Sequence, residues 1–283
     1  HAHINQIRSD SGGTVTGRFS YNHPNLQQIP SRGQFAKDIR KIFIPEAGEY
    51  WLKADYSQQE PRLLTHFARL VDQPGSGEVQ KAYLEKDLDF HQQTADMAGV
   101  QRSLAKTIGL GVMYGMGYHK LARELDMEPQ EAKAMLQDFH AKVPFMKGML
   151  EAVMNRANSK GVIRTLLGRK CRFDLWEPTQ WGVHKALPLN QAQTEYGMAI
   201  KRAYTYKALN RLIQGSAADQ TKKAMVDVYE EMGIIPLIQV HDELDCSVKD
   251  EKQGKQIKEV MENCIKLEVP SKVDTEMNKS WGG

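Results

Sequence analysis

Apolar and polar positions alternate in short runs near both ends of the chain and repeat with a helical period through its middle. The run from Leu237 to Asp245 is apolar, is broken by two adjacent carboxylates and then resumes, which predicts a hairpin with acids at its tip. Residues 51–57 form a second apolar run that ends in acid and hydroxyl side chains. Two such strands side by side would present hard oxygen ligands that suit Mg²⁺. A solvated turn is the alternative for the hairpin taken alone.

The other patterns predict the remaining elements. Short strands are expected over 14–20 and at two places within 39–57, helices over 62–70, 90–97, 102–114, 119–126 and 129–142, a hairpin over 161–173, long helices over 181–209 and 214–232, a helix over 250–267 and a closing strand over 272–277. Asp89 is the expected N-cap of the second helix, and Pro129 is expected in the first turn of its own. Strands at both ends and helices between them predict an α+β fold, with a helical insertion between two acidic strands.

The composition of the chain excludes some classes of protein but does not identify a function. The 283 residues can bury a substantial core, and the net charge of +3 permits a nucleic-acid partner without arguing for one. The three cysteines are scattered along the sequence: Cys171, Cys246 and Cys264. This spacing favours a reducing intracellular compartment and argues against a structural zinc site. The apolar runs are too short for a membrane span. Because the first residue is His1, we expect a fragment, a processed product or part of a longer protein.

One stripe of the helix at 102–114 carries candidate chemistry. Its members are spaced four apart and drift slowly around the helix: Arg102, Lys106, Leu110 and Tyr114. Two cations could hold phosphates, and the aromatic ring could stack on a base. His91, one helix earlier, could add a donor, although singly it is typical of a surface or capping histidine. A solvated basic face is the alternative for the spacing alone.

Five segments together resemble the polymerase domain of family A (polymerase I-like) DNA polymerases, most closely the phage versions. They are 16–20 with 24–30 (TGRFS…PNLQQIP), 55–62 (DYSQQEPR, similar to motif A), 102–115 (similar to motif B, RxxxKxxxFxxxYG), 214–219 (QGSAAD) and 241–243 (HDE, motif C). They occur in the family's order over nearly the whole chain. The resemblance implies a right-hand fold with an antiparallel palm sheet, inserted helical fingers and a largely absent thumb. Palm is expected over 1–85 and 196–283, and fingers over 86–195.

The resemblance also implies roles. Asp55 and Asp242, with the Tyr56 carbonyl, would hold two Mg²⁺ ions, for which Mn²⁺ could substitute, and Glu243 would be secondary. Lys106 could donate a proton to the departing pyrophosphate. The other residues expected to contact the nucleotide are Arg102, His91, Gln58, Glu60 as a steric gate against ribose, Leu110 and Tyr114. The residues expected to contact DNA are Arg18, Asn25, Gln27, Gln214 and His241.

Some features depart from the family pattern. Leu110 replaces Phe or Tyr, Gln28 replaces Asn, and Gln59 and Pro61 replace Ile and Leu; Pro61 should cap or bend its helix. The expected partners are primer–template DNA, deoxynucleoside triphosphates and an upstream thumb or exonuclease region, with no membrane. The expected location is the cytoplasm of a bacterium or phage-infected host.

Two other functions remain open. A single-subunit RNA polymerase shares the architecture, but Glu60 favours deoxynucleotide selection. A non-catalytic nucleic-acid-binding remnant would be marked by loss of Asp55, Lys106 or Asp242, and all three are present.

Overall fold

The computed structural model describes all residues except 1, 10–11, 87 and 181. The chain divides into two units: His1–Leu63 with Gln214–Gly283, and Leu64–Ile213. We call them unit 1 and unit 2. Two helices, α2 (Gln59–Leu70) and α10 (Ala208–Met232), contribute residues to both units.

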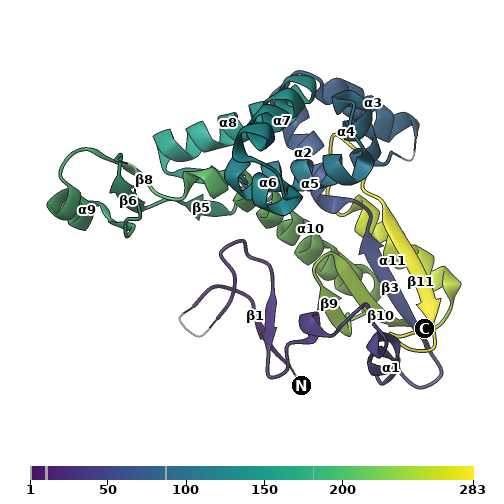
Figure 1. Cartoon of the computed structure of the whole chain (residues 1–283). Helices are drawn as coiled ribbons and strands as arrows, with labels where there is room; N and C mark the ends of the chain where they lie inside the picture. The colour runs from purple at the N-terminus through teal and green to yellow at the C-terminus, as the bar shows by residue number, and fades with distance from the viewer. Residues whose placement is uncertain (1, 10–11, 87, 181) are drawn as a thin grey trace. The chain divides into compact units, whose positions relative to one another are not determined.

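Unit 1 contains a four-stranded antiparallel sheet in the order β11 (Val273–Asn278), β3 (Tyr50–Tyr56), β10 (Glu243–Val248) and β9 (Ile238–Val240) (Figure 1). The predicted hairpin, the strand at 51–57 and the closing strand are therefore confirmed. β3 is the strand that joins β10 to β11, so the two acidic segments lie on neighbouring strands.

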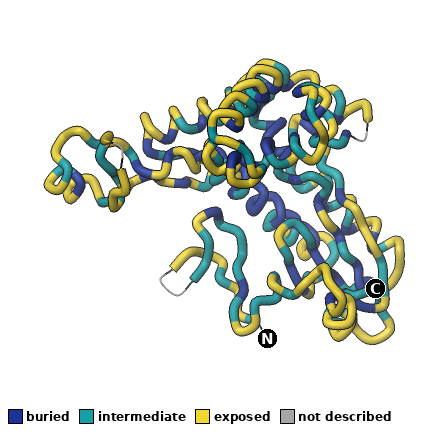
Figure 2. The backbone as a smooth tube through the Cα atoms, in the orientation of Figure 1, coloured by how far each residue is buried: buried dark blue, intermediate teal, exposed yellow. Residues whose placement is uncertain are grey.

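The two faces of this sheet differ because side chains alternate along each strand. Leu52, Ala54 and Tyr56 pack on one face against α10 and α11 (Glu251–Asn263), through side chains such as Val228 and Ile257. Figure 2 shows this core as dark blue tube. The other face carries Trp51, which stacks on Trp281 with ring centroids 6.2 Å apart and an interplanar angle of 26°.

The N-terminal part of unit 1 differs from the sequence prediction. β1 (His3–Asn5) pairs with β2 (Ser20–Asn22), so residues 14–19 do not form the predicted strand; Gly17 has φ 83°, which a strand does not allow. A short 3₁₀ helix, η1 (Leu26–Gln28), follows. The first strand predicted within 39–57 is also wrong, because α1 (Ala36–Lys41) covers its beginning and residues 42–49 form no strand. Asp38 in its first turn and Arg40 and Lys41 in its last turn complement the helix dipole.

Unit 2 is built mainly from helices. These are α3 (Ser76–Glu85), α4 (Phe90–Ala98), α5 (Arg102–Met113), α6 (Tyr118–Leu125), α7 (Pro129–Lys142) and α8 (Pro144–Lys160). The predicted cap is confirmed, since the Asp89 side chain accepts hydrogen bonds from the backbone N–H groups of His91 and Gln92. Pro129 also begins its helix as predicted.

The last part of unit 2 is a pair of small sheets. The predicted hairpin is confirmed as β4 (Val162–Arg164) and β5 (Lys170–Arg172). The long helix predicted over 181–209 is wrong, and its first residue lies outside the described residues. The region forms a three-stranded sheet, β7 (Leu187–Pro188), β6 (Leu175–Pro178) and β8 (Ile200–Arg202), with the short α9 (Leu189–Tyr196). Pro188 stands just before α9, and Gly197, with φ 72°, ends it.

Candidate active site

The hairpin between β9 and β10 places an acid at the end of the sheet. Val240 pairs with Glu243, so His241 and Asp242 alone form the loop. His241 has φ 57°, the positive value that a two-residue hairpin loop of type II′ needs at its first position. Local turn geometry therefore fixes the position of Asp242 in the loop, directly before the return strand that begins at Glu243.

Asp55 lies beside this tip. It is directly opposite Glu243 in the ladder, and the backbone N–H of Tyr56 donates to the Asp242 carbonyl at 3.3 Å. Burial first, then the charges of Asp242 and Glu243, raise the pKa of Asp55 to about 7. Burial also raises the pKa of Asp242, while the charge of Arg18 opposes that rise. The two acids predicted from separate motifs are thus electrostatic neighbours.

The donor chemistry of this pair fits a divalent cation. Carboxylate and carbonyl oxygens are the hard ligands that Mg²⁺ and Mn²⁺ prefer, and a cation between the two acids would offset the repulsion that raises the pKa of Asp55. Within the described part of the chain, no group of three or more His, Cys, Asp or Glu side chains is arranged to hold a metal. Mg²⁺ commonly binds through one or two carboxylates and completes its shell with water and substrate phosphates.

Glu60, the expected steric gate, is held by Arg18, an expected DNA contact. Arg18 Nη2 donates to Glu60 Oε1 at 2.6 Å, and both side chains are largely buried. Arg18 also lines a small cleft with Gln27 and His241, two further residues expected to contact DNA. Asn25 caps the turn before this cleft by accepting from the Gln27 backbone N–H at 3.1 Å. Sequence spacing alone could not reveal the Arg18–Glu60 pair, because 42 residues separate its members.

The unusual polar residue of motif A has a structural explanation. Gln59 is buried, and its amide donates to the Ala217 carbonyl, Gln220 Oε1 and Thr221 Oγ1 of α10 at 3.1–3.3 Å. A polar network thus replaces the apolar contact of the family motif and connects α2 to α10. Pro61 lies in the first turn of α2, as predicted, where a missing N–H costs no helical hydrogen bond.

The predicted stripe of α5 lies on its exposed side. Arg102, Lys106 and Tyr114 are exposed and Leu110 is half-buried, whereas Ala105, Ile108 and Val112 are buried on the opposite side. His91 is near the cationic end of the stripe. Burial and the charge of Lys106 lower the pKa of His91, and its buried Nδ1 has no hydrogen-bond partner among the described residues.

Arg102 makes an ion pair that the sequence did not predict. Its Nε and Nη2 both lie 2.7 Å from Oδ2 of Asp89, the residue that also caps α4. The cap and the ion pair use different oxygens, because the backbone N–H groups of His91 and Gln92 bind Oδ1. A phosphate binding to Arg102 would therefore compete with Asp89.

Comparison with known proteins places the chain in a family. The family model described as DNA polymerase family A matches residues 1–283. The chain belongs to DNA polymerase family A. Members of this family use divalent metal ions, and the mixed helical and antiparallel-sheet architecture is that of its polymerase domain.

Three family A proteins illustrate the similarity. A DNA-directed DNA polymerase of Pseudomonas phage M6 is 38% identical over 331 aligned residues, covering 100% of this chain and 46% of the relative. The thermostable DNA polymerase I of Thermus aquaticus is 33% identical, covering 99% and 32%. A solved structure of the polymerase domain of M. smegmatis Pol1, in complex with DNA primer-template and dNTP, has a TM-score of 0.80 and 30% identity, covering 100% of this chain and 48% of that one. The chain thus spans half or less of the length of each.

The residues predicted for the site divide between the two units. Unit 1 holds Asp55 with Tyr56, Gln58 and Glu60, the DNA candidates Arg18, Asn25, Gln27, Gln214 and His241, and the acids Asp242 and Glu243; unit 2 holds His91, Arg102, Lys106, Leu110 and Tyr114. Two residues near the site were missed by sequence reasoning: Asp89, noted only as a cap, and Asp245. Asp245 is fully buried and accepts from Trp51 Nε1 at 2.7 Å. An acid within an otherwise apolar strand was the available signal.

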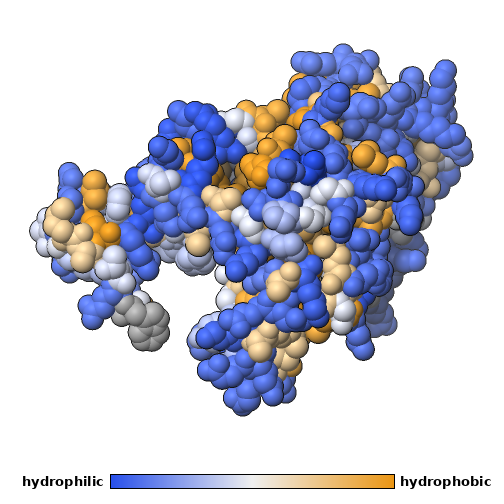
Figure 3. All heavy atoms as spheres, turned by 90° about the horizontal axis from the view of Figure 1, so that it is seen from above, coloured by the Kyte–Doolittle hydropathy of each residue, from blue (hydrophilic) through white to orange (hydrophobic). Residues whose placement is uncertain are grey.

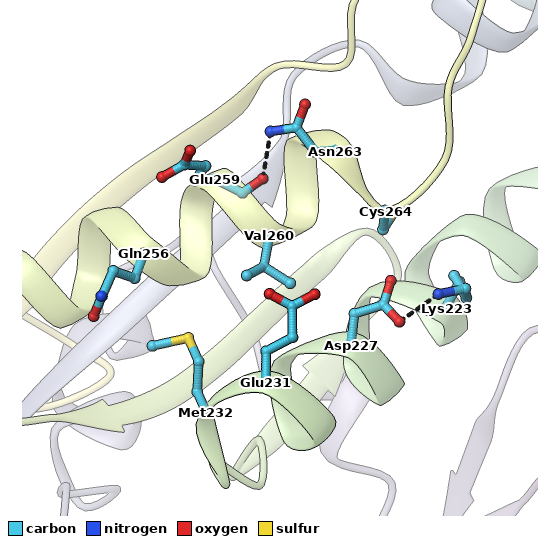
Figure 4. A pocket seen from close by; sticks show the side chains of 9 residues that line it. All are labelled: Lys223, Asp227, Glu231, Met232, Gln256, Glu259, Val260, Asn263 and Cys264. Carbon is cyan, nitrogen blue, oxygen red and sulfur yellow. Dashed lines mark hydrogen bonds and ion pairs between the residues drawn. The ribbon is translucent and has the colours of Figure 1, made fainter.

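A further cleft of unit 1 contains none of the predicted site residues. It lies between α10 and α11 and is lined by Asp227, Glu231, Glu259 and other residues, with Lys223 paired to Asp227 (Figure 4).

None of the helices in the described part of the protein is long and apolar enough to cross a membrane.

Proposed function

We propose that this chain carries the polymerase site of a template-directed DNA polymerase, which adds deoxynucleoside triphosphates to a primer 3′-hydroxyl and releases pyrophosphate. The observation that carries the proposal is the pairing of β3 with β10, which brings Asp55 beside Asp242. We propose replication of a phage or bacterial genome, in the cytoplasm of the cell, as its setting, because the relatives include phage and bacterial polymerases.

Asp55, Asp242 and the Tyr56 carbonyl would hold two Mg²⁺ ions, with Mn²⁺ as a substitute. Two bound ions would supply activation of the primer hydroxyl and neutralisation of the phosphate charge. The protein's own contribution is to hold two carboxylates at the ends of adjacent strands, where the ladder and the two-residue loop leave little freedom. Glu243 lies opposite Asp55 and would support this arrangement.

The cations of α5 would bind the triphosphate. Arg102 and Lys106 lie on one exposed side of the helix, and His91 is close enough for Lys106 to lower its pKa. A neutral His91 would offer a ring N–H to a phosphate oxygen, and Lys106 would deliver a proton to the departing pyrophosphate. Gln58, Leu110 and Tyr114 would complete the nucleotide contacts; their roles rest on the motif resemblance.

Glu60 would exclude ribonucleotides. Its carboxylate is fixed by Arg18 at 2.6 Å, so it cannot readily turn away from a 2′-hydroxyl. The DNA contacts would come from the cleft of Arg18, Gln27 and His241. Asn25 and Gln214 would add further contacts, and their roles rest on the motif resemblance. An RNA polymerase is the second candidate, and Glu60 is the feature that disfavours it.

Extension of a labelled primer on a DNA template tests this function. The protein should extend the primer with Mg²⁺ and deoxynucleotides and should fail with ribonucleotides alone. Extension with ribonucleotides would overturn the role of Glu60. No extension with either substrate, by protein that binds the primer–template, would favour a non-catalytic remnant.

A further inference from the structure

β10 places two acids on the face of the four-stranded sheet that carries Trp51. The neighbouring Leu244 points to the opposite face, where it joins the core against α10 and α11, so Glu243 and Asp245 share the first face. Figure 1 shows β10 beside β3, and Glu243 is directly opposite Asp55 in that pair. Like charges at opposite positions of a ladder repel each other, so the position of Glu243 needs a contact that offsets the repulsion.

Two indole rings supply hydrogen bonds to these acids. Trp51 Nε1 donates to Asp245 Oδ1 at 2.7 Å, and Trp281 Nε1 donates to Glu243 Oε1 at 3.3 Å. The two rings are themselves stacked, with centroids 6.2 Å apart and an interplanar angle of 26°. Each acid is therefore held by its own ring within one stacked pair.

Trp281 is fixed by its surroundings. It is fully buried, whereas the face of the protein drawn in Figure 3 is mainly hydrophilic, with apolar side chains in scattered groups. The guanidinium carbon of Arg40 lies 4.1 Å from the centroid of the Trp281 ring, and Phe43 meets that ring edge-on at a centroid distance of 5.4 Å. The backbone N–H of Trp281 also donates to the Phe43 carbonyl at 3.0 Å. A donor held through both its ring and its backbone restricts the carboxylate that it binds.

Glu243 lies near the two acids of the candidate metal site but is not arranged as a third ligand. Its charge helps to raise the pKa of Asp55 to about 7, after burial and the charge of Asp242. Among the residues that the structure describes, no group of three or more His, Cys, Asp or Glu side chains is placed to hold a metal ion. The carboxylate of Glu243 therefore lies beside the site while its Oε1 is bound to the indole.

A flexible carboxylate beside a cation site interferes with that site unless it is held. Divalent cations attract free carboxylates strongly, and Mg²⁺ keeps several positions of its octahedral shell for water and substrate phosphates. Without the indole, Glu243 would turn towards bound cations and occupy one of these positions. The hydrogen bond from Trp281 opposes that movement.

We propose that Trp281 is a positioning residue for the polymerase reaction: its indole N–H holds Glu243 beside Asp55 and outside the coordination shell of the cations. This inference rests on the proposed function, because it assigns a role beside the site of that reaction. Trp51 provides the comparison within the same ring pair. It holds Asp245, which lies opposite Lys53 and thus two positions further along the ladder from Asp55.

Binding of Mn²⁺ to the protein without DNA tests the proposal, with free Mn²⁺ measured by electron paramagnetic resonance. Trp281→Phe removes the N–H donor but keeps an aromatic ring to stack on Trp51. Glu243→Gln is made alone and together with Trp281→Phe, which completes a double-mutant cycle. Trp51→Phe is the matched control, because it removes the other N–H of the same pair. Primer extension by each protein is measured in parallel.

Trp281→Phe should bind Mn²⁺ about three- to tenfold more tightly than wild type, because the hydrogen bond that competes with the cation for Glu243 is gone. In the Glu243→Gln background the same substitution should leave the affinity unchanged, and Trp51→Phe should bind as wild type does. In primer extension, Trp281→Phe should lower kcat about tenfold and leave the KM for nucleotide unchanged. General damage to the fold would weaken Mn²⁺ binding instead of strengthening it.

Weaker or unchanged Mn²⁺ binding by Trp281→Phe would overturn the proposal, and so would an equal gain in the Glu243→Gln background. If Trp281→Phe does not fold, the indole N–H resonance of Trp281 in isotope-labelled wild-type protein decides. It should keep its position when Mg²⁺ is added. A displacement equal to that caused by Glu243→Gln would mean that Glu243 leaves the indole for the ion, which contradicts the proposal.

Failure of the proposed function has a different signature. In that case wild-type protein would add no nucleotide to the primer, while Trp281→Phe would still gain affinity for Mn²⁺ through Glu243.

Discussion

The stability of unit 1 should fall as pH rises through the neutral range, because of Asp245. This residue is fully buried, and Oδ1 accepts from Trp51 Nε1 while the other oxygen has no partner among the described residues. Burial, followed by the charge of Glu243, raises the pKa of Asp245 to about 9. Asp245→Asn keeps the shape and the acceptor for Trp51 but removes the titration.

The sign follows from proton binding. Between pH 4 and pH 9 the folded protein keeps a proton on Asp245 that the unfolded chain has released, so the folded state binds more protons and stability falls with rising pH. The slope is at most ~1.4 kcal/mol per pH unit. At pH 7 the loss relative to pH 4 is therefore at most about 4 kcal/mol.

The assay is urea unfolding in chelator, followed by tryptophan fluorescence, at several values from pH 4 to pH 9. The free energy of unfolding of Asp245→Asn minus that of wild type should increase steadily across this window. Asp38→Asn, an exposed acid of the same unit, is the matched control and should show little change with pH. A difference between Asp245→Asn and wild type that does not vary with pH would refute the reasoning.

Two further substitutions test the pairs found in the structure. Glu60→Ala should raise incorporation of ribonucleotides relative to deoxynucleotides by about 10- to 100-fold, measured as a ratio of kcat/KM, because the group that Arg18 holds in place is gone; an unchanged ratio would contradict the gate. Asp89→Ser keeps an N-cap on α4 but releases Arg102 from its ion pair, so the KM for nucleotide should fall by up to about fivefold, given that exposed pairs are worth up to ~1 kcal/mol. A rise in KM would instead mean that Asp89 assists nucleotide binding.

Regular patterns in the sequence predicted the helices and strands that carry the candidate site. They could not predict side-chain contacts between residues far apart in the sequence. The hairpin with Asp242, the strand that ends in Asp55 and the exposed stripe of Arg102 and Lys106 follow from period and turn chemistry, and the structure confirms these elements. The predicted helix over 181–209 failed because Pro188 and Gly197 interrupt a segment whose residues otherwise favour a helix.

Two contacts between residues far apart in the sequence show why the remainder was missed. Arg18 meets Glu60 across 42 residues, and Trp51 meets Asp245 across 194, so neither contact leaves a periodic signal in one sequence. Gln59 looked like a defect in an apolar motif. Its three hydrogen-bond partners lie on α10. Tertiary packing brings α10 beside Gln59, and the sequence of the motif alone does not show this contact. The assigned roles of the site residues therefore stay predictions until activity is measured.

The most direct test of the central claim is primer extension by Asp55→Ala and Asp242→Ala beside wild type, with binding of the same primer–template measured in parallel. The carboxylate pair should be required for chemistry and not for binding DNA, so each variant should bind with near wild-type affinity and add no nucleotide with Mg²⁺ or Mn²⁺. Extension by either variant at a rate close to wild type would contradict the account.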